Sequence, residues 1–129
     1  RASQAGVNID AVVRGMCSLR PGVPGLSDNI RVRSIVGRFL EHHRAFYFHN
    51  GGDPELFLSS ADWMERNFFR RVEIAFPVLD KKHRERLIEQ LHAYIADAAQ
   101  SWMLQADGSY QRPAVTDGKP VQQRLMEET

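Results

Sequence analysis

The chain of 129 residues contains a single cysteine, Cys17, and has no apolar run long enough to span a bilayer. One cysteine cannot build a disulfide framework, and this favours a reducing, intracellular setting. No signal-peptide pattern opens the sequence. With 43% hydrophobic and 26% charged residues, the composition is that of an ordinary soluble globular protein, which excludes a disordered chain. The length fits one domain with a modest core.

Lysine is absent from residues 1–50, where seven arginines and three acidic residues give a net charge of +4. Residues 51–129 hold ten Lys or Arg against thirteen Asp or Glu, which gives −3. The use of arginine alone favours forked, bidentate recognition of phosphate or carboxylate groups. Ordinary surface salt bridges explain the same composition equally well, so both interpretations stay open.

Hydrophobic periodicity predicts an α/β fold. We expect strands at residues 8–15, 44–50, 55–61 and 69–78, helices at 29–42 and 81–104, and a short terminal helix in VQQRLMEE. The second and third strands are joined by NGGDP, a turn signal typical of a hairpin. A hairpin within an alternating order of strands and helices favours a mixed β-sheet flanked by helices.

The ends of the chain suggest how the domain is organised. Asp80 is expected to cap the long helix. The opening letters RASQAGV read as the end of a helix that stops at Gly6, and this indicates a domain excised from a larger protein. We assign residues 1–105 to the domain and residues 106–129 to its C-terminal tail.

Three cationic residues share one side of the helix predicted at 29–42. With 100° per residue, Arg31, Arg38 and His42 fall within about 40° of one another, beside the apolar sector expected to face the core. Such a stripe is suited to the wall of a phosphate-binding cleft. A solvated charged face is the alternative, and it remains open.

Arg14 is a second candidate for anion binding. It ends a strand in which Val12 and Val13 are expected to be buried, and ligands of open α/β sheets bind at the carboxyl ends of strands. A salt bridge to a neighbouring loop is the alternative. Glycines follow at positions 15, 22 and 25, but their spacing matches neither a nucleotide-binding P-loop nor a dinucleotide fingerprint.

The histidines do not predict a metal site. Zinc needs three or four converging ligands, whereas His42 and His43 are adjacent and would point about 100° apart on a helix. Nucleophilic catalysis is not indicated either, because Cys17 has no evident base and a Gly-x-Ser-x-Gly motif is absent.

A polar stretch, SSADWMERNFFRR, follows the third predicted strand. Ser60, Asp62 and Asn67 can line a site or cap a turn between strands, and physical considerations alone favour the caps. His43 is expected to be structural, on the core side of its helix. The role of His49 stays undecided.

Longer, ordered motifs resemble a known family. The stretches RGMCSLRPGVPGLS, SIVGRFLEH and NGGDPELFLSSADWMERN are similar to the C-terminal catalytic domain of bacterial polyphosphate kinases of the long-chain-synthesising type. The resemblance runs from about Arg1 to the terminal PVQQRLMEE. It implies an enzyme that transfers the terminal phosphate of ATP to polyphosphate, reversibly and with Mg²⁺. The transfer would pass through a phosphohistidine in the preceding domain, a segment that this chain does not contain.

The resemblance also implies residue roles. Arg14 and His42 match family positions that contact ATP, and His42 is expected to assist phosphotransfer as an acid or base. Arg14 would offset charge that develops on the transferred phosphoryl group. Arg31 and Arg38 are expected to extend the phosphate-binding surface, and Mg²⁺ is expected to be held mainly outside this chain.

The family's two catalytic domains are similar to phospholipase D, whose signature is His-x-Lys, then Asp, then Gly-Ser-x-Asn. In this sequence Arg44 replaces the Lys, His49 stands where the Asp is expected, and SSAD replaces Gly-Ser-x-Asn at a longer spacing. The resemblance therefore predicts a phospholipase D-like α/β fold without an independent phosphodiesterase site.

The resulting hypothesis is a domain of a polyphosphate kinase that is inactive alone and has ATP, polyphosphate and other domains of the same kinase as partners. The full-length kinase is expected to be a homo-oligomer in the cytoplasm, with peripheral membrane association as an option. Nucleic acid is not an expected partner, because an overall basic excess and a stacking platform are lacking. Two alternatives stay open, a non-catalytic module that binds polyphosphate or nucleic acid and a phospholipase D-like phosphodiesterase half-site.

Overall fold

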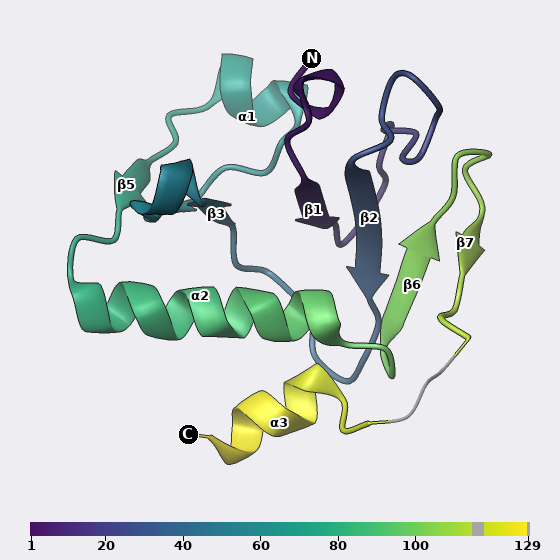
Figure 1. Cartoon of the computed structure of the whole chain (residues 1–129). Helices are drawn as coiled ribbons and strands as arrows, with labels where there is room; N and C mark the ends of the chain where they lie inside the picture. The colour runs from purple at the N-terminus through teal and green to yellow at the C-terminus, as the bar shows by residue number, and fades with distance from the viewer. Residues whose placement is uncertain (115–117, 129) are drawn as a thin grey trace. The chain divides into compact units, whose positions relative to one another are not determined.

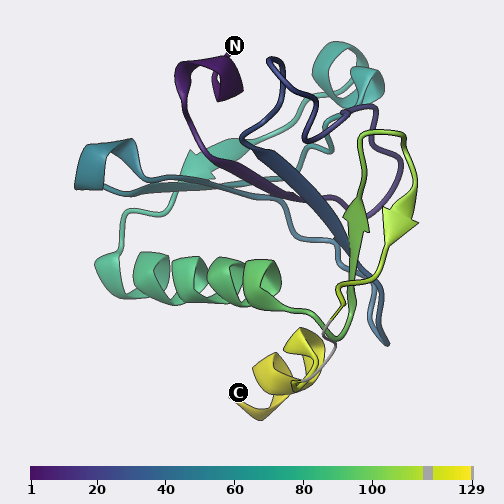
Figure 2. The same ribbon diagram turned by 45° about the vertical axis from the view of Figure 1, so that its right-hand side comes forward.

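The computed structural model describes residues 1–114 and 118–128. The chain divides into two compact units. Unit 1 comprises Arg1–Glu41 and the described residues from His92 onward, and unit 2 comprises His42–Leu91. Figure 1 shows the elements in chain order, and Figure 2 shows them turned by 45°. Each unit combines strands with helical segments, which confirms the predicted α/β class.

Unit 1 is built on a mixed sheet. Its strands, in spatial order, are β1 (Ile9–Val12), β2 (Ile30–Ile35), β6 (Ser101–Leu104) and β7 (Tyr110–Gln111). Strands β1 and β2 are parallel, whereas β6 is antiparallel to both of its neighbours. A short 3₁₀ turn, η1 (Ser3–Ala5), precedes β1 and ends at Gly6 with a φ of 86°, a left-handed conformation that glycine adopts without a steric penalty.

The core of unit 1 lies against one face of β2. Ile35 packs there with Ala93 and Tyr94 at the end of helix α2 (Lys81–Ala96) and with Val121 at the start of helix α3 (Val121–Glu127). The removal of these apolar side chains from water stabilises the unit. Arg33, on the same face of the strand, donates a hydrogen bond to the carbonyl of Ile95 and satisfies one of the last carbonyls of α2.

Unit 2 contains an antiparallel sheet of β3 (Ala45–Phe48), β4 (Glu55–Ser59) and β5 (Ala75–Pro77), in that order. The turn η2 (Asn50–Gly52) connects β3 to β4, the helix α1 (Glu65–Arg70) lies between β4 and β5, and α2 begins in this unit. Leu56, only 1% exposed, is the most deeply buried side chain of the sheet. Outside this small core the Phe46 and Trp63 rings stack with centroids 5.6 Å apart, although Trp63 is 78% exposed.

The helix predicted at residues 29–42 is wrong. The chain forms β2 over Ile30–Ile35, and residues 36–44 belong to no helix or strand. Ile30 and Val32 alternate with Arg31 and Arg33, which is the period of a strand, and β-branched side chains favour the extended backbone. The cationic stripe that this helix was expected to present does not exist.

The long helix is correct at its start and wrong at its end. Asp80 caps it as expected, with its carboxylate accepting a hydrogen bond from the His83 amide at 2.9 Å. The helix ends at Ala96, however, and the residues predicted to continue it form β6. The strand predicted at 69–78 also contracts to the three residues of β5.

Other predictions are confirmed. The β3–β4 pair is an antiparallel hairpin, β1 lies within the first predicted strand, and α3 occupies the terminal VQQRLMEE stretch. The single mixed sheet is a correction, since the hairpin belongs to a separate sheet of unit 2. The division of the domain at residue 105 stays a prediction. Within residues 1–114 and 118–128, no helix has the length and apolar character needed to cross a membrane.

Candidate functional site

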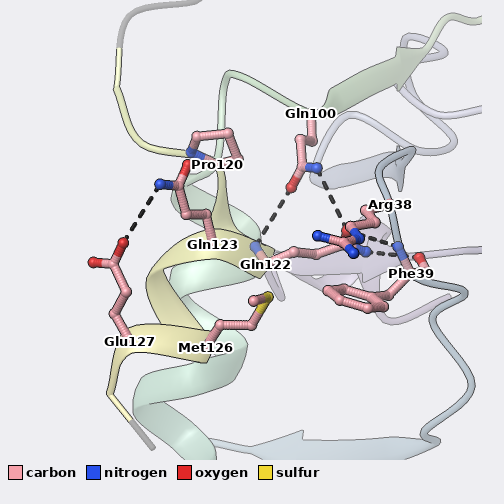
Figure 3. Close-up of a pocket in the computed structure, with 8 residues that line it drawn as sticks. All are labelled: Arg38, Phe39, Gln100, Pro120, Gln122, Gln123, Met126 and Glu127. Atoms are coloured by element: carbon pink, nitrogen blue, oxygen red, sulfur yellow. Dashed lines mark hydrogen bonds between the residues drawn. The ribbon is translucent and has the colours of Figure 1, made fainter.

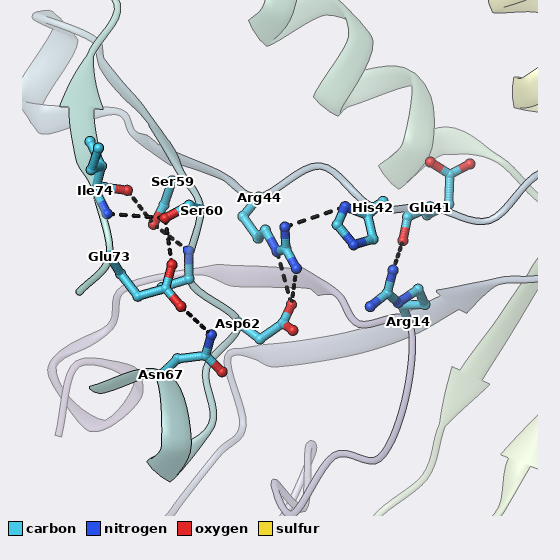
Figure 4. A network of polar contacts seen from close by, with 11 residues as sticks. Arg14, Glu41, His42, Arg44, Ser59, Ser60, Asp62, Asn67, Glu73 and Ile74 are labelled. Atoms are coloured by element: carbon cyan, nitrogen blue, oxygen red, sulfur yellow. Dashed lines mark hydrogen bonds and ion pairs between the residues drawn. The ribbon is translucent and has the colours of Figure 1, made fainter. Parts of the chain in front are cut away.

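Arg14 lies just beyond the carboxyl end of β1, in an exposed bend. Its guanidinium donates a hydrogen bond to the backbone carbonyl of Glu41 at 2.9 Å (Figure 4). Because β1 and β2 are parallel, their carboxyl ends meet at one edge of the sheet, and the segment that ends at Glu41 continues from β2 at this edge. Arg14 therefore follows the carboxyl end of a strand, as predicted, whereas Val12, which was expected to be buried, is 37% exposed. The anion-binding role of Arg14 stays a prediction.

The Glu41 carboxylate is held by two side chains from other elements of unit 1. The Tyr94 hydroxyl donates to one carboxylate oxygen at 2.9 Å, and Gln122 Nε2 donates to the other at 2.7 Å. Burial and the hydrogen bond to this carboxylate raise the pKa of Tyr94 well above its usual range, so its hydroxyl keeps its proton. Glu41 thus anchors the loop after β2 by its side chain while its carbonyl receives Arg14.

Arg31 is already engaged by a carboxylate. Its guanidinium forms a two-pronged contact with Asp10, at 2.8 and 3.0 Å, across the parallel pairing of β1 and β2. The hydrogen bond from Arg31 holds the pKa of the Asp10 carboxyl below its usual value. The salt-bridge alternative raised for the arginine-rich half of the chain therefore applies to Arg31.

Arg38 lies in the loop after β2, with its guanidinium 5.5 Å from the centre of the Phe39 ring. Both residues line a surface pocket of unit 1 with a volume of about 450 Å³. Figure 3 shows the other lining residues, which lie directly before β6, directly before α3 and on α3: Gln100, Pro120, Gln122, Gln123, Met126 and Glu127. Arg31 and Arg38 are thus on different elements, a strand and the loop after it.

In unit 2, His42 is exposed and belongs to no helix. Its Nδ1 lies 3.3 Å from Nη1 of Arg44, and Arg44 in turn makes 2.8 Å contacts with the Asp62 carboxylate through Nε and Nη2 (Figure 4). A guanidinium can only donate, so Nδ1 of His42 accepts in this pair. The neutral imidazole then carries its proton on Nε2, the nitrogen that points away from Arg44.

A second polar cluster of unit 2 joins the segments on either side of α1. The Glu73 carboxylate accepts hydrogen bonds from the Ser60 hydroxyl at 2.5 Å and from the Asn67 amide at 2.6 Å. These two bonds lower the pKa of Glu73 from its usual value. Ser60 also accepts from the Ile74 amide at 3.0 Å. Ser60 therefore closes the connection from β4 to β5 as a turn residue would, and Asn67 joins α1 to the segment that follows it.

The remaining candidates are placed as follows. His43 is exposed and not on a helix, so its predicted place on the core side is wrong. Nδ1 of His49 lies 3.5 Å from the Tyr47 hydroxyl, and Cys17 is a half-buried free thiol. Across residues 1–114 and 118–128, no cluster of three or more His, Cys, Asp or Glu side chains could hold a metal ion.

Sequence reasoning missed Glu41, Arg44 and Gln122. Arg44 carried a signal, since its i+2 spacing from His42 puts the two side chains on the same side of an extended chain. Glu41 and Gln122 carried none, because they are 81 residues apart in the sequence and meet only in the folded unit.

Comparisons with known proteins agree with one another. The family described as "Polyphosphate kinase C-terminal domain 2" matches residues 1–124. The polyphosphate kinase of Pseudomonas aeruginosa is 65% identical over 116 residues, which cover 90% of this chain and 17% of that protein. The polyphosphate kinase of Paraburkholderia phytofirmans is 62% identical over 112 residues, covering 86% of this chain and 16% of that protein.

A solved structure gives the same result for the backbone. The crystal structure of polyphosphate kinase from Porphyromonas gingivalis matches with a TM-score of 0.91 and 42% identity, over 98% of this chain and 20% of that one. The chain therefore spans between about a sixth and a fifth of the length of these relatives.

Proposed function

The chain belongs to the family of polyphosphate kinase C-terminal domains, and we propose that it contributes phosphate-binding residues to a kinase that transfers the terminal phosphate of ATP to inorganic polyphosphate, reversibly. The fold would be phospholipase D-like. The phosphohistidine of the reaction would form on a histidine outside this chain, in the preceding domain. ATP, polyphosphate and the other domains of the kinase would be its partners, in a homo-oligomer with a cytoplasmic location.

The state of Arg14 is the main support for this proposal. Its guanidinium is exposed and donates to a neutral carbonyl, whereas Arg31 is bound to the Asp10 carboxylate. An arginine whose partner is neutral keeps its full charge available for an anion, and its planar fork matches two phosphate oxygens. Arg14 can therefore keep its hydrogen bond to the Glu41 carbonyl through Nη1 and offer its other N–H groups to a nucleotide phosphate, and it would offset negative charge on the transferred phosphoryl group.

His42 is proposed to act through Nε2. Because Arg44 donates to Nδ1, the neutral imidazole presents an N–H at Nε2 to solvent. This group can donate a hydrogen bond to a phosphate oxygen, and after protonation of the ring it can donate a proton. The Arg44–Asp62 pair would hold the ring in this tautomer.

Arg31 and Arg38 remain proposed contributors to phosphate binding, with different requirements. Arg31 would first have to leave Asp10, whereas Arg38 is exposed and lies over the face of the Phe39 ring. Mg²⁺ would enter with the nucleotide, since ATP-dependent enzymes bind it largely through substrate phosphates. The residues described by the structure do not form a metal cluster of their own.

Calorimetric titration of magnesium–ATP and of polyphosphate into the chain tests this proposal. Loss of a charge-assisted hydrogen bond weakens binding by roughly 10- to 100-fold, so Arg14→Ala and His42→Ala are each expected to bind ATP at least tenfold more weakly. Arg70→Ala, which removes an arginine from α1 in unit 2, is the matched control for a loss of charge. It is expected to bind ATP like the parent chain.

Each other outcome would change the assignment. Polyphosphate binding without ATP binding would make this chain an anion-docking module and would leave nucleotide recognition to other domains. Equal weakening of ATP binding in Arg70→Ala would show that the effect comes from net charge and not from a specific contact. Synthesis of polyphosphate from ATP by this chain alone would contradict a phosphohistidine located elsewhere.

A further inference from the structure

We propose that Gln122 of helix α3 is a positioning residue, which fixes the loop that receives Arg14 and thereby sets the affinity for nucleotide phosphate. This inference rests on the proposed role of Arg14. Gln122 lies in unit 1 with Arg14 and the loop, so the whole argument concerns a single compact unit.

The Gln122 side chain forms hydrogen bonds with the backbone of the loop after β2. It is 6% exposed, its Oε1 accepts a hydrogen bond from the Phe39 amide at 3.0 Å, and its Nε2 donates to the Phe39 carbonyl at 2.7 Å. Nε2 also donates to the Glu41 carboxylate at 2.7 Å. A primary amide has two N–H donors and a carbonyl acceptor, and here all of these are used on one loop. No apolar side chain of similar size can replace these three bonds.

The loop is shaped to approach this amide. Gly37 lies so close to Gln100 Nε2 and Gln122 Oε1 that a Cβ at this position would overlap both atoms. The absence of a side chain at Gly37 therefore permits the contact between the loop and α3. Gln100 also contacts α3, because its Oε1 accepts a hydrogen bond from the backbone amide of Gln122 at 3.4 Å.

Helix α3 is itself fixed to unit 1 at its first residue. The Val121 amide donates to the Asp97 carboxylate at 2.7 Å in a buried position, and the Val121 side chain belongs to the apolar core. Asp97 also accepts from the Gln100 amide at 2.6 Å. Gln122 therefore projects from a helix whose first residue is held in the core, and a positioning residue requires such a support.

The last link connects the loop to Arg14. Glu41 ends the segment held by Gln122, and its carbonyl accepts the hydrogen bond of Arg14. A long arginine side chain on an exposed bend has many rotamers, and a fixed acceptor reduces the entropy lost when a ligand orders it. If the loop were released, the Glu41 carbonyl would no longer be held in place, so Arg14 would bind phosphate less well. Gln122 would have this effect without contacting the ligand.

The rival explanation is that Gln122 only stabilises the fold. A purely structural loss lowers the fraction of active protein and the melting temperature but leaves the KM for ATP unchanged. A positioning role raises the KM for ATP among the molecules that remain folded, in the same direction as Arg14→Ala.

The test uses a polyphosphate kinase of the relatives' length that contains this chain. Gln122→Met keeps the side-chain volume and removes all three hydrogen bonds to the loop. We expect a roughly tenfold rise in the KM for ATP, the size that the loss of buried hydrogen bonds supports, with kcat changed by less than about threefold. Gln111→Met, at an exposed position of β7 in the same unit, is the control and is expected to leave both constants unchanged.

A second variant reaches the same contact from the other side. Gly37→Ala places a Cβ against Gln122 and Gln100 and is expected to raise the KM for ATP in the same way. Because both substitutions break a single contact, the double variant should be no worse than the more affected single variant. An unchanged KM in both variants, or an equal change in Gln111→Met, would overturn the inference.

A spectroscopic measurement separates this inference from the proposed function. The guanidinium N–H resonances of Arg14, whose Nη1 donates to the Glu41 carbonyl, should shift in Gln122→Met and Gly37→Ala but not in Gln111→Met when they are recorded by NMR on the chain without ATP. A shift in a protein that shows no ATP-dependent activity would refute the proposed function and keep the positioning role. Full activity of the parent kinase with no shift in either variant would refute the positioning role alone.

Discussion

Unit 1 and unit 2 hold their candidate functional residues by different means. In unit 1, Gln122 and Asp97 are buried, and they fix a loop and a helix around a core that includes Ile35 and Val121. In unit 2 the buried apolar side chains are Leu56 and Ala61, and large side chains such as Trp63, Phe69 and Val72 are at least 78% exposed. Unit 1 therefore positions Arg14 from a buried frame, whereas unit 2 positions His42 through a polar network near its surface.

The difference predicts unequal sensitivity to the same core substitution. Leu56 on β4 and Leu104 on β6 are both buried leucines in strands, at 1% and 6% exposure. Replacement of either by Ala is expected to cost about 2–5 kcal/mol of unfolding free energy, and Leu56→Ala removes the larger share of its unit's core. Hydrogen exchange should then show loss of protection across unit 2 in Leu56→Ala, with unit 1 still protected.

Leu104→Ala is the matched comparison, and Leu79→Ala, at an 80% exposed position of unit 2, is the control. Leu104→Ala should reduce protection mainly in unit 1, and Leu79→Ala should have little effect. If Leu56→Ala and Leu104→Ala open the whole chain equally, the two units unfold as one cooperative body and the contrast between them is wrong.

Buried polar anchors should matter more in unit 1 than in unit 2. Asp97→Asn replaces one acceptor oxygen by an NH₂ group that faces the buried amide of either Val121 or Gln100. Such an unsatisfied group costs about 1–3 kcal/mol. Asp62→Asn in unit 2 alters a pair whose side chains are 20–27% exposed, so water can compensate and the cost should be smaller. Chemical denaturation of both variants measures the two costs, and an equal or larger cost for Asp62→Asn would reverse the comparison.

The contrast also explains which parts of the fold the sequence predicts. The β3–β4 hairpin is encoded locally, because Asn50, Gly51 and Gly52 all adopt positive φ angles in the turn that joins the strands. The alternation of Ile30 and Val32 with arginines was an equally local signal for β2, and the helical interpretation overlooked its period. These features depend on neighbours in the sequence and can be predicted from it.

The end of α2 and the candidate site depend on distant residues. The helix stops at Ala96 because Asp97 turns towards Val121 and Gln100, and the first of these partners is 24 residues away. Gln122 meets Phe39 across 83 residues. No pattern within a short window of sequence contains this information. The resemblance to a family singled out Arg14 and His42 as candidates, and the residues that hold them became visible only in the structure.

The surface network of unit 2 should act on the His42 ring more than on stability. Arg44→Met removes the donor to Nδ1 of His42, so the fraction of neutral imidazole protonated at Nε2 should fall. A hydrogen bond of ordinary net strength, about 1 kcal/mol, corresponds to a change of roughly fivefold in the tautomer ratio. Nitrogen NMR shifts of the His42 ring report this ratio directly. Arg70→Met is the control, and an unchanged ratio in Arg44→Met would show that Arg44 does not orient the ring.

The smallest expected effect belongs to the Asp10–Arg31 pair at the surface of unit 1. The hydrogen bond from Arg31 lowers the folded-state pKa of Asp10 below its usual value, so the pair contributes stability above the unfolded-state pKa and loses it as the pH falls through the folded-state pKa. Because the Arg31 side chain is 52% exposed, solvent and salt screen the pair, and its contribution near pH 7 should be about 0.2–1 kcal/mol. Asp10→Asn should therefore be slightly less stable than the parent chain at pH 7 and equally stable in acid, at a pH below the folded-state pKa of Asp10. Urea denaturation at both pH values measures the difference, and a gap that persists or grows in acid would show that Asp10 acts through packing, as the buried anchors of unit 1 do, and not through its charge.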